Sequence, residues 1–309
     1  MGTPEFACPS LEMLLARRGD RVVGVVCQPD RPRGRGLTVE PPPVKRLALA
    51  HGLPVLQPHT LREESTLETL RGWAPDVVVV AAYGRILPPS VLEIPAHGCL
   101  NVHASLLPRH RGAAPVAWAI LEGDTITGVT IMVMNDQLDA GDMLVVRETP
   151  IAPDDTTGSL TARLATLGAE ALGEALDLLQ SGKAVPIPQP RVGVTVAPKL
   201  DRDAGRLDWH QSALQLDRRI RAVTPEPGAF TFVRGKLLKV HRAAPCSGEP
   251  VTAPPGSILR VDRDGIVVAT GAGALRLLEI QLEGRRRMPA AAFAAGARLG
   301  AGQRLGDPT

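Results

Sequence analysis

Apolar, strand-like runs alternate with helical segments through the first part of this chain. Three such runs lie at Arg21–Cys27, Asp76–Ala82 and Gly98–His103, and the first two are rich in valine. Strands of this composition are typical of parallel sheets that are covered on both faces. Helical patterns lie before and between them, at residues 9–18, 44–51 and 61–73. The alternation predicts an α/β fold with a doubly wound, mostly parallel sheet.

The pattern continues to residue 182 and then stops. A helix is predicted over residues 114–122, strands over 127–134 and 143–149, and a long amphipathic helix over 157–180. Prolines and glycines then remove the periodicity, so residues 183–200 are predicted to be a linker. We therefore place the first domain at residues 1–182.

The remaining residues, 201–309, have a different pattern. One helix is predicted over residues 212–223, and short strands follow it at close intervals. The strand candidates are residues 229–233, 236–241, 257–261, 265–270 and 274–280. Short strands separated by glycine and proline predict a small β-barrel as the second domain. Residues 284–309 are rich in alanine, glycine and arginine and receive no assignment.

Composition narrows the class of protein. The chain has 309 residues, and its four cysteines are widely spaced, with no Cys-x-x-Cys pair. We expect free thiols in a reducing cytoplasm rather than disulfides or a zinc site. No run approaches the roughly 18 apolar residues of a membrane span, and the first residues do not resemble a signal peptide. The sequence thus predicts a cytoplasmic protein with no membrane partner.

Charge is distributed unevenly along the chain. Residues from Asp201 onward carry 17 Lys and Arg against 11 Asp and Glu, whereas the whole chain carries 35 against 32. A basic second domain on a mildly acidic first domain suits a catalytic domain with an appendage that binds a polyanion. A solvated, arginine-biased surface explains the same counts equally well.

A polar pair interrupts the apolar strand at Gly98–His103. Asn101 and His103 are two residues apart, so their side chains share one face of the strand. Asn101 offers an amide donor, and His103 offers an imidazole that titrates near neutral pH. For this pair alone, a buried strand with one hydrogen-bonded histidine is the plainer interpretation. The chain leaves this strand through a segment that contains Pro108, and an acidic loop follows later at Leu138–Asp142. Both features favour a functional site at the end of the strand.

The segment from Gln28 to Pro43 is rich in glycine and proline, and it is predicted to lack regular structure. It carries Arg31, Arg33 and Arg35. Arginines between glycines suit contacts with phosphate groups, and a mobile, solvated loop is the alternative.

Together these motifs resemble a known family. Asn101-x-His103 is followed by Ser-Leu-Leu-Pro at residues 105–108 and by Leu-Asp-x-Gly at residues 138–141. This order is similar to the signature of 10-formyltetrahydrofolate-dependent formyltransferases. Similarity to the members that formylate methionyl-tRNA rests on residues 2–6, 28–32 and 105–115. The resemblance extends over nearly the whole chain and is weakest after Gly284.

The resemblance implies a reaction and a set of residues. The reaction is transfer of a formyl group from 10-formyltetrahydrofolate to the free amino group of initiator methionyl-tRNA, for translation initiation. The implied catalytic residues are Asn101, His103 and Asp139. The residues implied to contact the folate are Ser105, Leu106, Leu107, Pro108, Tyr83 and Gly84. The residues implied to contact the tRNA are Arg31, Arg33 and Arg35. No metal is implied, the second domain is implied to be an OB-like barrel that binds tRNA, and we expect a monomer.

Formyl transfer to an amine places negative charge on the formyl oxygen. A preorganised donor aimed at such an oxygen is commonly worth about 3–4 kcal/mol. We expect Asn101 and a protonated His103 to fill this role. Asp139 is expected to raise the pKa of His103 and to receive the proton of the amine, directly or through a water.

Three features depart from the family pattern. Members have an apolar first strand before the motif at Gly2, and this strand is missing here, so we expect the natural start to lie upstream of Met1. His110 and Glu226 stand where relatives usually have tryptophan. Neither is expected to touch the catalytic residues.

Two other functions stay open at this point. A formyltransferase that acts on a nucleotide sugar or a purine precursor shares the Asn-x-His pair and the aspartate. A non-catalytic RNA-binding module explains the basic second half but leaves the polar pair without a role. Such a module also needs aromatic side chains for base stacking, and aromatic residues make up only 3% of the chain.

Overall fold

The structure, a computed structural model, describes residues 1–33, 38–246 and 251–306. The chain forms two compact units, each built from segments that are separate in the sequence. The first unit comprises Met1–Pro115, Ile126–Pro150 and Leu160–Pro198. The second comprises Val116–Thr125, Ile151–Ser159 and Lys199–Thr309.

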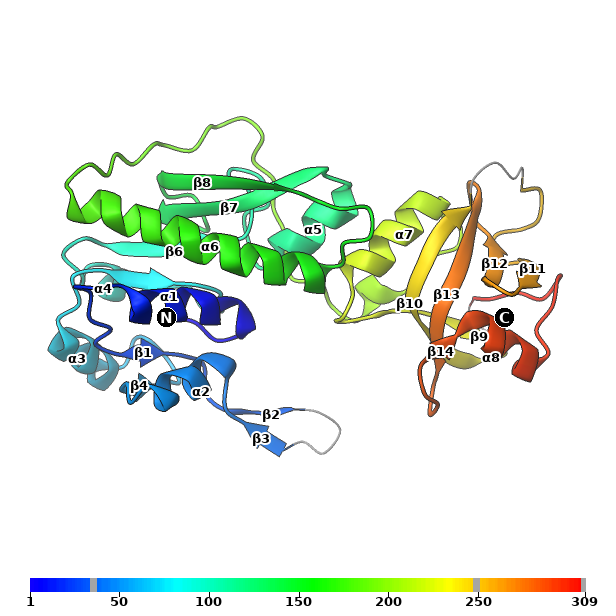
Figure 1. The fold of residues 1–309 in the computed structure, drawn as a ribbon, viewed down its shortest axis with the longest axis horizontal. Helices are drawn as coiled ribbons and strands as arrows, with labels where there is room; N and C mark the ends of the chain where they lie inside the picture. Colours follow the sequence, from blue (N-terminus) through cyan, green and yellow to red (C-terminus); the bar gives the residue numbers. More distant parts are fainter. Residues whose placement is uncertain (34–37, 247–250, 307–309) are drawn as a thin grey trace. The chain divides into compact units, whose positions relative to one another are not determined.

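The first unit contains the alternating elements that the sequence predicts (Figure 1). Its strands are β1 (Val25–Val26), β2 (Arg31–Arg33), β3 (Thr38–Glu40), β4 (Val55–Leu56), β5 (Val78–Val80), β6 (Cys99–His103), β7 (Ile126–Val133) and β8 (Met143–Pro150). Its helices are η1 (Glu5–Ala7), α1 (Cys8–Ala16), α2 (Pro43–Ala50), α3 (Glu64–Trp73), α4 (Pro89–Leu92) and most of α6 (Thr157–Gln180). The α/β class of this unit is therefore confirmed.

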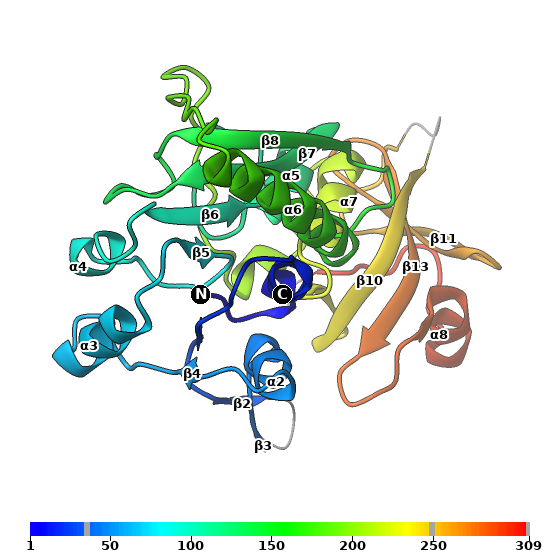
Figure 2. The ribbon, with the colours of Figure 1, turned by 60° about the vertical axis from the view of Figure 1, so that its left-hand side comes forward.

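The sheet of the first unit is mixed, so the prediction of a mostly parallel sheet is wrong. β5 and β6 pair in parallel, but β6 with β7 and β7 with β8 pair antiparallel (Figure 2). The connection between β7 and β8, residues 134–142, is shorter than the dozen or so residues that a parallel crossover needs. A separate parallel ladder joins β1 to β4.

Helix α6 lies along the strands β6, β7 and β8 (Figure 1). Leu164, Leu172 and Leu176 are among its buried residues. The approach to β6 is closest at Gly168, where an added Cβ would lie 2.7 Å from a methyl group of Val102. Val102 stands between Asn101 and His103, so this contact supports the strand that carries both side chains.

The second unit is built on one antiparallel sheet. Its strands follow the order β11 (Ile258–Asp262), β12 (Gly265–Ala269), β13 (Ala274–Leu282), β10 (Lys236–Cys246) and β9 (Ala229–Val233), with β14 (Met288–Pro289) beside β13. Its helices are α5 (Pro115–Glu122, from residue 116 onward), η2 (Asp203–Gly205), α7 (Ala213–Ala222) and α8 (Ala290–Ala297). Buried side chains of α7, α8 and these strands form one core.

This sheet does not close into the predicted barrel in the part of the chain that the structure describes. Its outermost strands, β9 and β11, are covered by irregular segments instead of by each other. The Leu207 N–H donates to the Phe230 carbonyl in β9, at 2.9 Å, and the Ile258 N–H in β11 donates to the Gln303 carbonyl, at 2.7 Å. Because these bonds satisfy the strand edges, closure is not needed to pair them.

Within the described ranges, no helix combines the length and the apolar character needed to cross a membrane.

Candidate active site

Three predicted residues meet at the end of β6. Asn101 and His103 are buried on one face of this strand, where they lie opposite Met132 and Thr130 of β7. Asp139 belongs to the loop between β7 and β8 and adopts a left-handed backbone conformation, with φ of 46°. The antiparallel return from β7 to β8 therefore carries the aspartate back to the strand that holds the other two.

Hydrogen bonds fix the carboxylate of Asp139. Its Oδ1 accepts from Asn101 Nδ2 at 3.3 Å, and its Oδ2 accepts from the Gly112 backbone N–H at 2.8 Å. His103 Nδ1 lies 3.7 Å from Oδ2. The three predicted residues thus form one polar cluster, with Asn101 bonded directly to Asp139 and His103 just beyond hydrogen-bond distance.

The two ring nitrogens of His103 have different environments. Nε2 lies 2.9 Å from the His110 carbonyl, which can only accept, so Nε2 carries a proton. Burial lowers the pKa of His103 below its usual range, although the Asp139 carboxylate opposes this shift. A neutral ring with a lone pair on Nδ1 is the state that follows at neutral pH. This differs from the predicted protonated histidine because the cost of burying the charge outweighs the attraction of one carboxylate.

His110 was expected to have no contact with the catalytic residues, and this is wrong. The contact uses the backbone carbonyl of His110 rather than its side chain. The His110 N–H donates in turn to the Thr195 hydroxyl at 2.8 Å. A residue other than tryptophan at position 110 is therefore compatible with the hydrogen bond to His103.

Gln189 braces the loop of Asp139. Its Nε2 donates to the carbonyls of Asp139 and Gly141, at 2.9 and 2.8 Å. Its Oε1 accepts from Arg111 Nε and from a terminal nitrogen of the same guanidinium, at 3.1 and 2.6 Å. One amide thereby links the Arg111 segment to the loop that positions the carboxylate.

The segment Ser105–Pro108 leaves β6 next to this cluster. The Thr130 hydroxyl donates to the Ser105 carbonyl at 2.8 Å and accepts from the Leu107 N–H at 3.2 Å. The Ser105 hydroxyl donates to the Arg109 carbonyl at 2.6 Å. Leu106 and Pro108 keep partly exposed apolar surface, so the turn is held from inside and presents two apolar side chains.

Two other predicted site residues, Tyr83 and Gly84, follow β5, the strand that pairs in parallel with β6. Tyr83 packs in a core with Val26 and Val80, and its carbonyl accepts from Gln28 Nε2 at 3.3 Å. Gly84 is exposed and has φ of 83°.

The basic segment is more ordered than the sequence predicts. Arg31–Arg33 forms the strand β2, which pairs antiparallel with β3 at Thr38–Glu40. The prediction of no regular structure is wrong here: Pro32 lies inside β2, opposite Val39. A two-stranded ribbon tolerates this proline because each of its strands is an edge strand. Arg31 is exposed on this ribbon, and Arg35 lies outside the described residues.

Sequence reasoning missed the supporting residues Gly112, Thr130, Thr195 and Gln189. Gly112 has φ of 124°, and an added Cβ there would lie 2.8 Å from the Ala197 carbonyl oxygen. Gly112 lies within the motif at residues 105–115, and this position could have indicated its role from the sequence. Gln189 has no such signal in the sequence, because it stands in a proline-rich segment without periodicity. Gly141 is required for space, since a Cβ would lie 1.7 Å from the Val133 carbonyl oxygen.

In the described ranges, no three His, Cys, Asp or Glu side chains are grouped closely enough to hold a metal ion.

The α/β unit with this polar cluster, followed by an antiparallel unit, matches one family of group-transfer enzymes. Residues 1–176 match the model of the formyl transferase family, and residues 199–298 match that of the formyl transferase C-terminal domain. The chain belongs to the formyl transferase family.

Its relatives point to one member of this family. The chain is 52% identical to the methionyl-tRNA formyltransferase of Geobacter sulfurreducens, over 99% of this chain and 96% of that protein. It is 55% identical to the methionyl-tRNA formyltransferase of Myxococcus xanthus, over 98% of this chain and 95% of that protein.

Solved structures share the fold at low identity. HypX from Aquifex aeolicus in complex with tetrahydrofolic acid superposes with a TM-score of 0.61 at 23% identity, covering 90% of this chain and 48% of that chain. The sugar 3N-formyl transferase WlaRD, in the presence of dTDP and 5-N-formyl-THF, has a TM-score of 0.68 at 13% identity, covering 92% and 97%. At these identities the likeness supports the fold alone.

Proposed function

We propose that this chain transfers a formyl group from 10-formyltetrahydrofolate to the free amino group of the methionyl moiety of initiator methionyl-tRNA, for translation initiation. The observation that carries the proposal is the cluster of Asn101, His103 and Asp139 at the end of β6. It stands in a chain about half identical, over nearly its whole length, to methionyl-tRNA formyltransferases.

The cluster can accept the proton of an attacking amine. Nδ1 of neutral His103 and Oδ2 of Asp139 are both acceptors, and they lie 3.7 Å apart. Two facing acceptors are stabilised by a donor nitrogen that lies beside the pair and hydrogen-bonds to it, and the amino group of the acceptor substrate is such a donor. As its nitrogen forms the bond to the formyl carbon, Nδ1 takes the proton and Asp139 stabilises the resulting imidazolium.

Asn101 can stabilise the negative charge that develops on the formyl oxygen. Its Nδ2 carries two hydrogens, and the contacts of the described chain use one of them, toward Asp139 Oδ1. The other hydrogen remains for an oxyanion. Because the side chain is buried, such a bond is made in a site of low dielectric, where it has a large effect on the rate.

The residues after β6 suit the formyl donor. Leu106 and Pro108 present apolar surface on a turn that Thr130 holds. The donor supplies the activated formyl group, and the transfer ends when its nitrogen leaves with a proton. His103 is the group placed to return that proton. We assign folate contacts to Ser105, Leu106, Leu107 and Pro108, and to Tyr83 and Gly84 by resemblance only.

The remaining assignments belong to the same proposal. Residues 1–182 perform the chemistry, residues 201–309 form the domain that holds tRNA, and residues 183–200 connect them. Arg31, Arg33 and Arg35 contact the tRNA. The enzyme acts as a monomer in the cytoplasm, with no metal.

Acceptor competition tests this function. The purified chain is incubated with 10-formyltetrahydrofolate and one of three acceptors, and release of tetrahydrofolate is followed. The acceptors are initiator methionyl-tRNA, an amino-sugar nucleotide and free methionine. We expect formylation of the tRNA at a rate at least ~10²-fold above the other two. Preferred use of the amino-sugar nucleotide would instead establish the alternative function.

Substitutions at the cluster test the mechanism. His103→Ala, Asn101→Ala and Asp139→Ala should each lower kcat by at least ~10²-fold, with the melting temperature little changed. Asp136→Ala is the matched control, because Asp136 is an exposed carboxylate in the same loop. Near-normal turnover in any of the three variants would remove that residue from the mechanism.

A further inference from the structure

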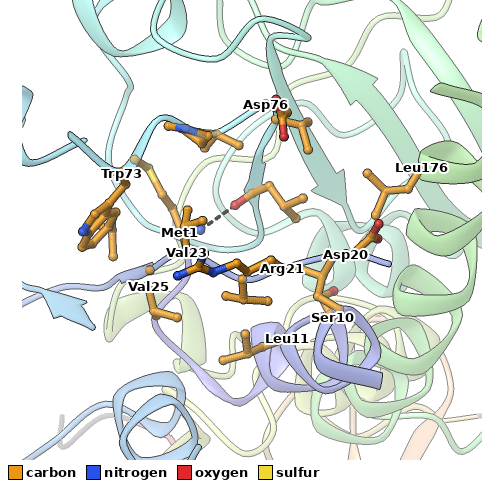
Figure 3. Close-up of a pocket in the computed structure, with 18 of the residues that line it drawn as sticks. Met1, Ser10, Leu11, Asp20, Arg21, Val23, Val25, Trp73, Asp76 and Leu176 are labelled. Atoms are coloured by element: carbon orange, nitrogen blue, oxygen red, sulfur yellow. Dashed lines mark hydrogen bonds between the residues drawn. The ribbon is translucent and has the colours of Figure 1, made fainter. Parts of the chain in front are cut away.

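The segment that leads into the β2–β3 ribbon changes from apolar to polar over a few residues. At Val25, β1 lies beside a cavity lined mostly by apolar side chains, among them Leu11 and Trp73 (Figure 3). Just beyond β1, Gln28 is buried although its side chain is polar. Buried polar groups need hydrogen-bond partners, so the partners of Gln28 and its neighbours show what holds this segment.

Gln28 is fixed through both its side chain and its backbone. Its Nε2 donates to the Tyr83 carbonyl at 3.3 Å, and its backbone N–H donates to the Thr3 hydroxyl at 3.3 Å. Its carbonyl accepts from Gln57 Nε2 at 2.8 Å. Gln57 directly follows β4, the strand that pairs with β1, so these bonds extend the attachment of the segment beyond the ladder.

Asp30 closes the base of the ribbon. It stands immediately before β2, whereas Lys45 stands in the first turn of α2, after the ribbon. Lys45 Nζ lies 3.0 and 2.7 Å from the two carboxylate oxygens of Asp30, and Gln57 Nε2 donates to Oδ1 at 2.7 Å. The ion pair therefore joins the chain before the ribbon to the chain after it. We call the side chains of Asp30, Lys45 and Gln57 the clamp.

The clamp is partly shielded from water. The side chains of Lys45 and Asp30 keep 20% and 30% of their surface exposed, whereas the next residue, Arg31, is exposed. The Lys45 ammonium and the Gln57 amide hold the pKa of Asp30 below its usual range, so the carboxylate is charged at neutral pH. Contact of both oxygens with one ammonium, together with a further donor, gives the pair a defined geometry that an isolated surface pair lacks.

We propose that the clamp positions the acceptor substrate: it holds the base of the ribbon so that Arg31 and Arg33 on β2 meet the tRNA in a preset direction. The clamp residues act through the ribbon and do not contact the tRNA. A ribbon held in place before binding needs less ordering by the tRNA, which lowers KM for this substrate. The inference rests on the proposed function, since it takes methionyl-tRNA as the acceptor.

Asp30 distinguishes this role from simple attraction between charges. A carboxylate near a polyanion repels it, so removing the charge of Asp30 should lower KM for the tRNA if charge alone decides. The clamp predicts the opposite, because Asp30→Asn loses the ion pair with Lys45 and frees the base of the ribbon. Glu40→Gln is the matched control, since Glu40 is an exposed carboxylate on β3, opposite Arg31.

Kinetics of Asp30→Asn, Lys45→Met and the double variant, each in the full chain, test the proposal. We expect each to raise KM for methionyl-tRNA by about 5-fold, with KM for the folate within about 2-fold of the wild type. The double variant should match the single variants, because all three lose the same contact. Glu40→Gln should leave KM for the tRNA unchanged or lower it. An unchanged or lower KM for the tRNA in Asp30→Asn overturns the proposal, as does an additive effect in the double variant.

Amide exchange of the ribbon, measured without either substrate, tests the clamp independently of the reaction. Exchange at Arg31 and Val39 should be at least ~5-fold faster in Asp30→Asn and Lys45→Met than in the wild type and Glu40→Gln. A wild type that does not formylate methionyl-tRNA refutes the proposed function, whereas equal exchange rates in all four proteins refute the clamp. Faster exchange with an unchanged KM for the tRNA also overturns the proposal, because the clamp then holds the ribbon without positioning the substrate.

Discussion

His103 is buried at the end of β6, and its two ring nitrogens face different partners. Nε2 donates to a carbonyl, whereas Nδ1 faces the carboxylate of Asp139. Because burial lowers the pKa of this ring, the neutral form that can accept a proton is already dominant at neutral pH. The proposed mechanism uses that form, which gives the activity a defined dependence on pH.

The first prediction concerns this pH dependence. We expect kcat to rise with pH through the lowered pKa of His103, below about 6.5, and to stay level through neutral pH. The folded state binds fewer protons than the unfolded state in that window, so the free energy of unfolding rises with pH as well. His103 therefore contributes stability that is fully present above about pH 6.5 and is lost as pH falls through its folded pKa.

A pH profile of kcat for the wild type and His103→Gln checks the direction. The variant should lack the rise on the acid side as well as most of the activity. A wild-type kcat that instead falls as pH increases from about 5 to 7 would mean that a protonated His103 is required.

Gln189 is a positioning residue by the geometry, because it touches the backbone of the Asp139 loop rather than the reacting groups. Gln189→Leu keeps the approximate size but removes both donors and the acceptor for Arg111. We expect kcat to fall roughly 10-fold while KM for the folate changes less than about 3-fold, because the carboxylate loses its fixed position.

The control for Gln189 is Gln137→Leu, the same change at an exposed position in the Asp139 loop. It should leave kcat within about 2-fold of the wild type. If Gln189→Leu lowers the melting temperature but leaves kcat unchanged, Gln189 stabilises the fold and has no part in positioning Asp139.

At the scale of elements, helix α6 and strand β6 are coupled through one glycine. A Cβ at Gly168 would lie 2.7 Å from Val102 Cγ1, which is too close for an ordinary contact. At Gly173, in the same helix, the nearest atom to an added Cβ is the Met13 sulfur at 3.6 Å, an ordinary contact. The two positions therefore respond in opposite ways to the same substitution.

We predict that Gly168→Ala destabilises the protein by about 1–3 kcal/mol, because the helix must move away from β6. Gly173→Ala should stabilise it by up to about 1 kcal/mol, because alanine favours the helix. Denaturant unfolding of the two variants provides the free energies. Equal shifts would show that helix propensity, rather than the contact with Val102, decides the outcome.

Elements with local signals were predicted closely from the sequence. Helix α6 has the predicted bounds Thr157–Gln180, and β9 has the predicted bounds Ala229–Val233. The strands near Val25 and Val78 were predicted too long, because the ladders contain only Val25–Val26 and Val78–Val80, and the composition of a run does not encode where pairing ends. The antiparallel pairing of β7 and β8 and the residues of β14 and α8 depend on tertiary contacts and were not predicted.

The residues of the candidate site also divide into those that a local sequence signal marks and those that depend on tertiary contacts. Asn101 and His103 were singled out because strand periodicity places them on one face, whereas Asp139 was implied by the family resemblance. Their meeting point was not predictable from spacing alone, since it requires the return of the chain from β7 to β8. Gln189 reaches the loop from more than 40 positions away along the chain, which no local pattern encodes.

At the scale of the whole molecule, the binding of the two substrates should differ in its dependence on salt, because only the tRNA is a polyanion. A tRNA is a polyanion, so contacts with its phosphates release counterions and weaken as salt increases. The folate site proposed here is built from a turn with two apolar side chains, and its affinity should depend far less on salt. The residues from Asp201 onward carry a basic excess, and the β2–β3 ribbon carries Arg31 and Arg33 on its first strand.

The last prediction compares two arginine substitutions across a salt series. Arg31→Ala combined with Arg35→Ala should raise KM for methionyl-tRNA by about 10-fold and reduce the slope of log KM against log salt by up to about 2, one for each lost phosphate contact. KM for the folate should stay within about 2-fold. Arg62→Ala, an exposed arginine outside the ribbon, is the control for loss of charge anywhere on the surface. If the double variant keeps both the KM and the slope of the wild type, neither Arg31 nor Arg35 contacts the tRNA. The basic residues of the second unit then remain as the surface that holds the tRNA. Neutralising these residues in pairs should reduce the slope of log KM against log salt by the expected amount.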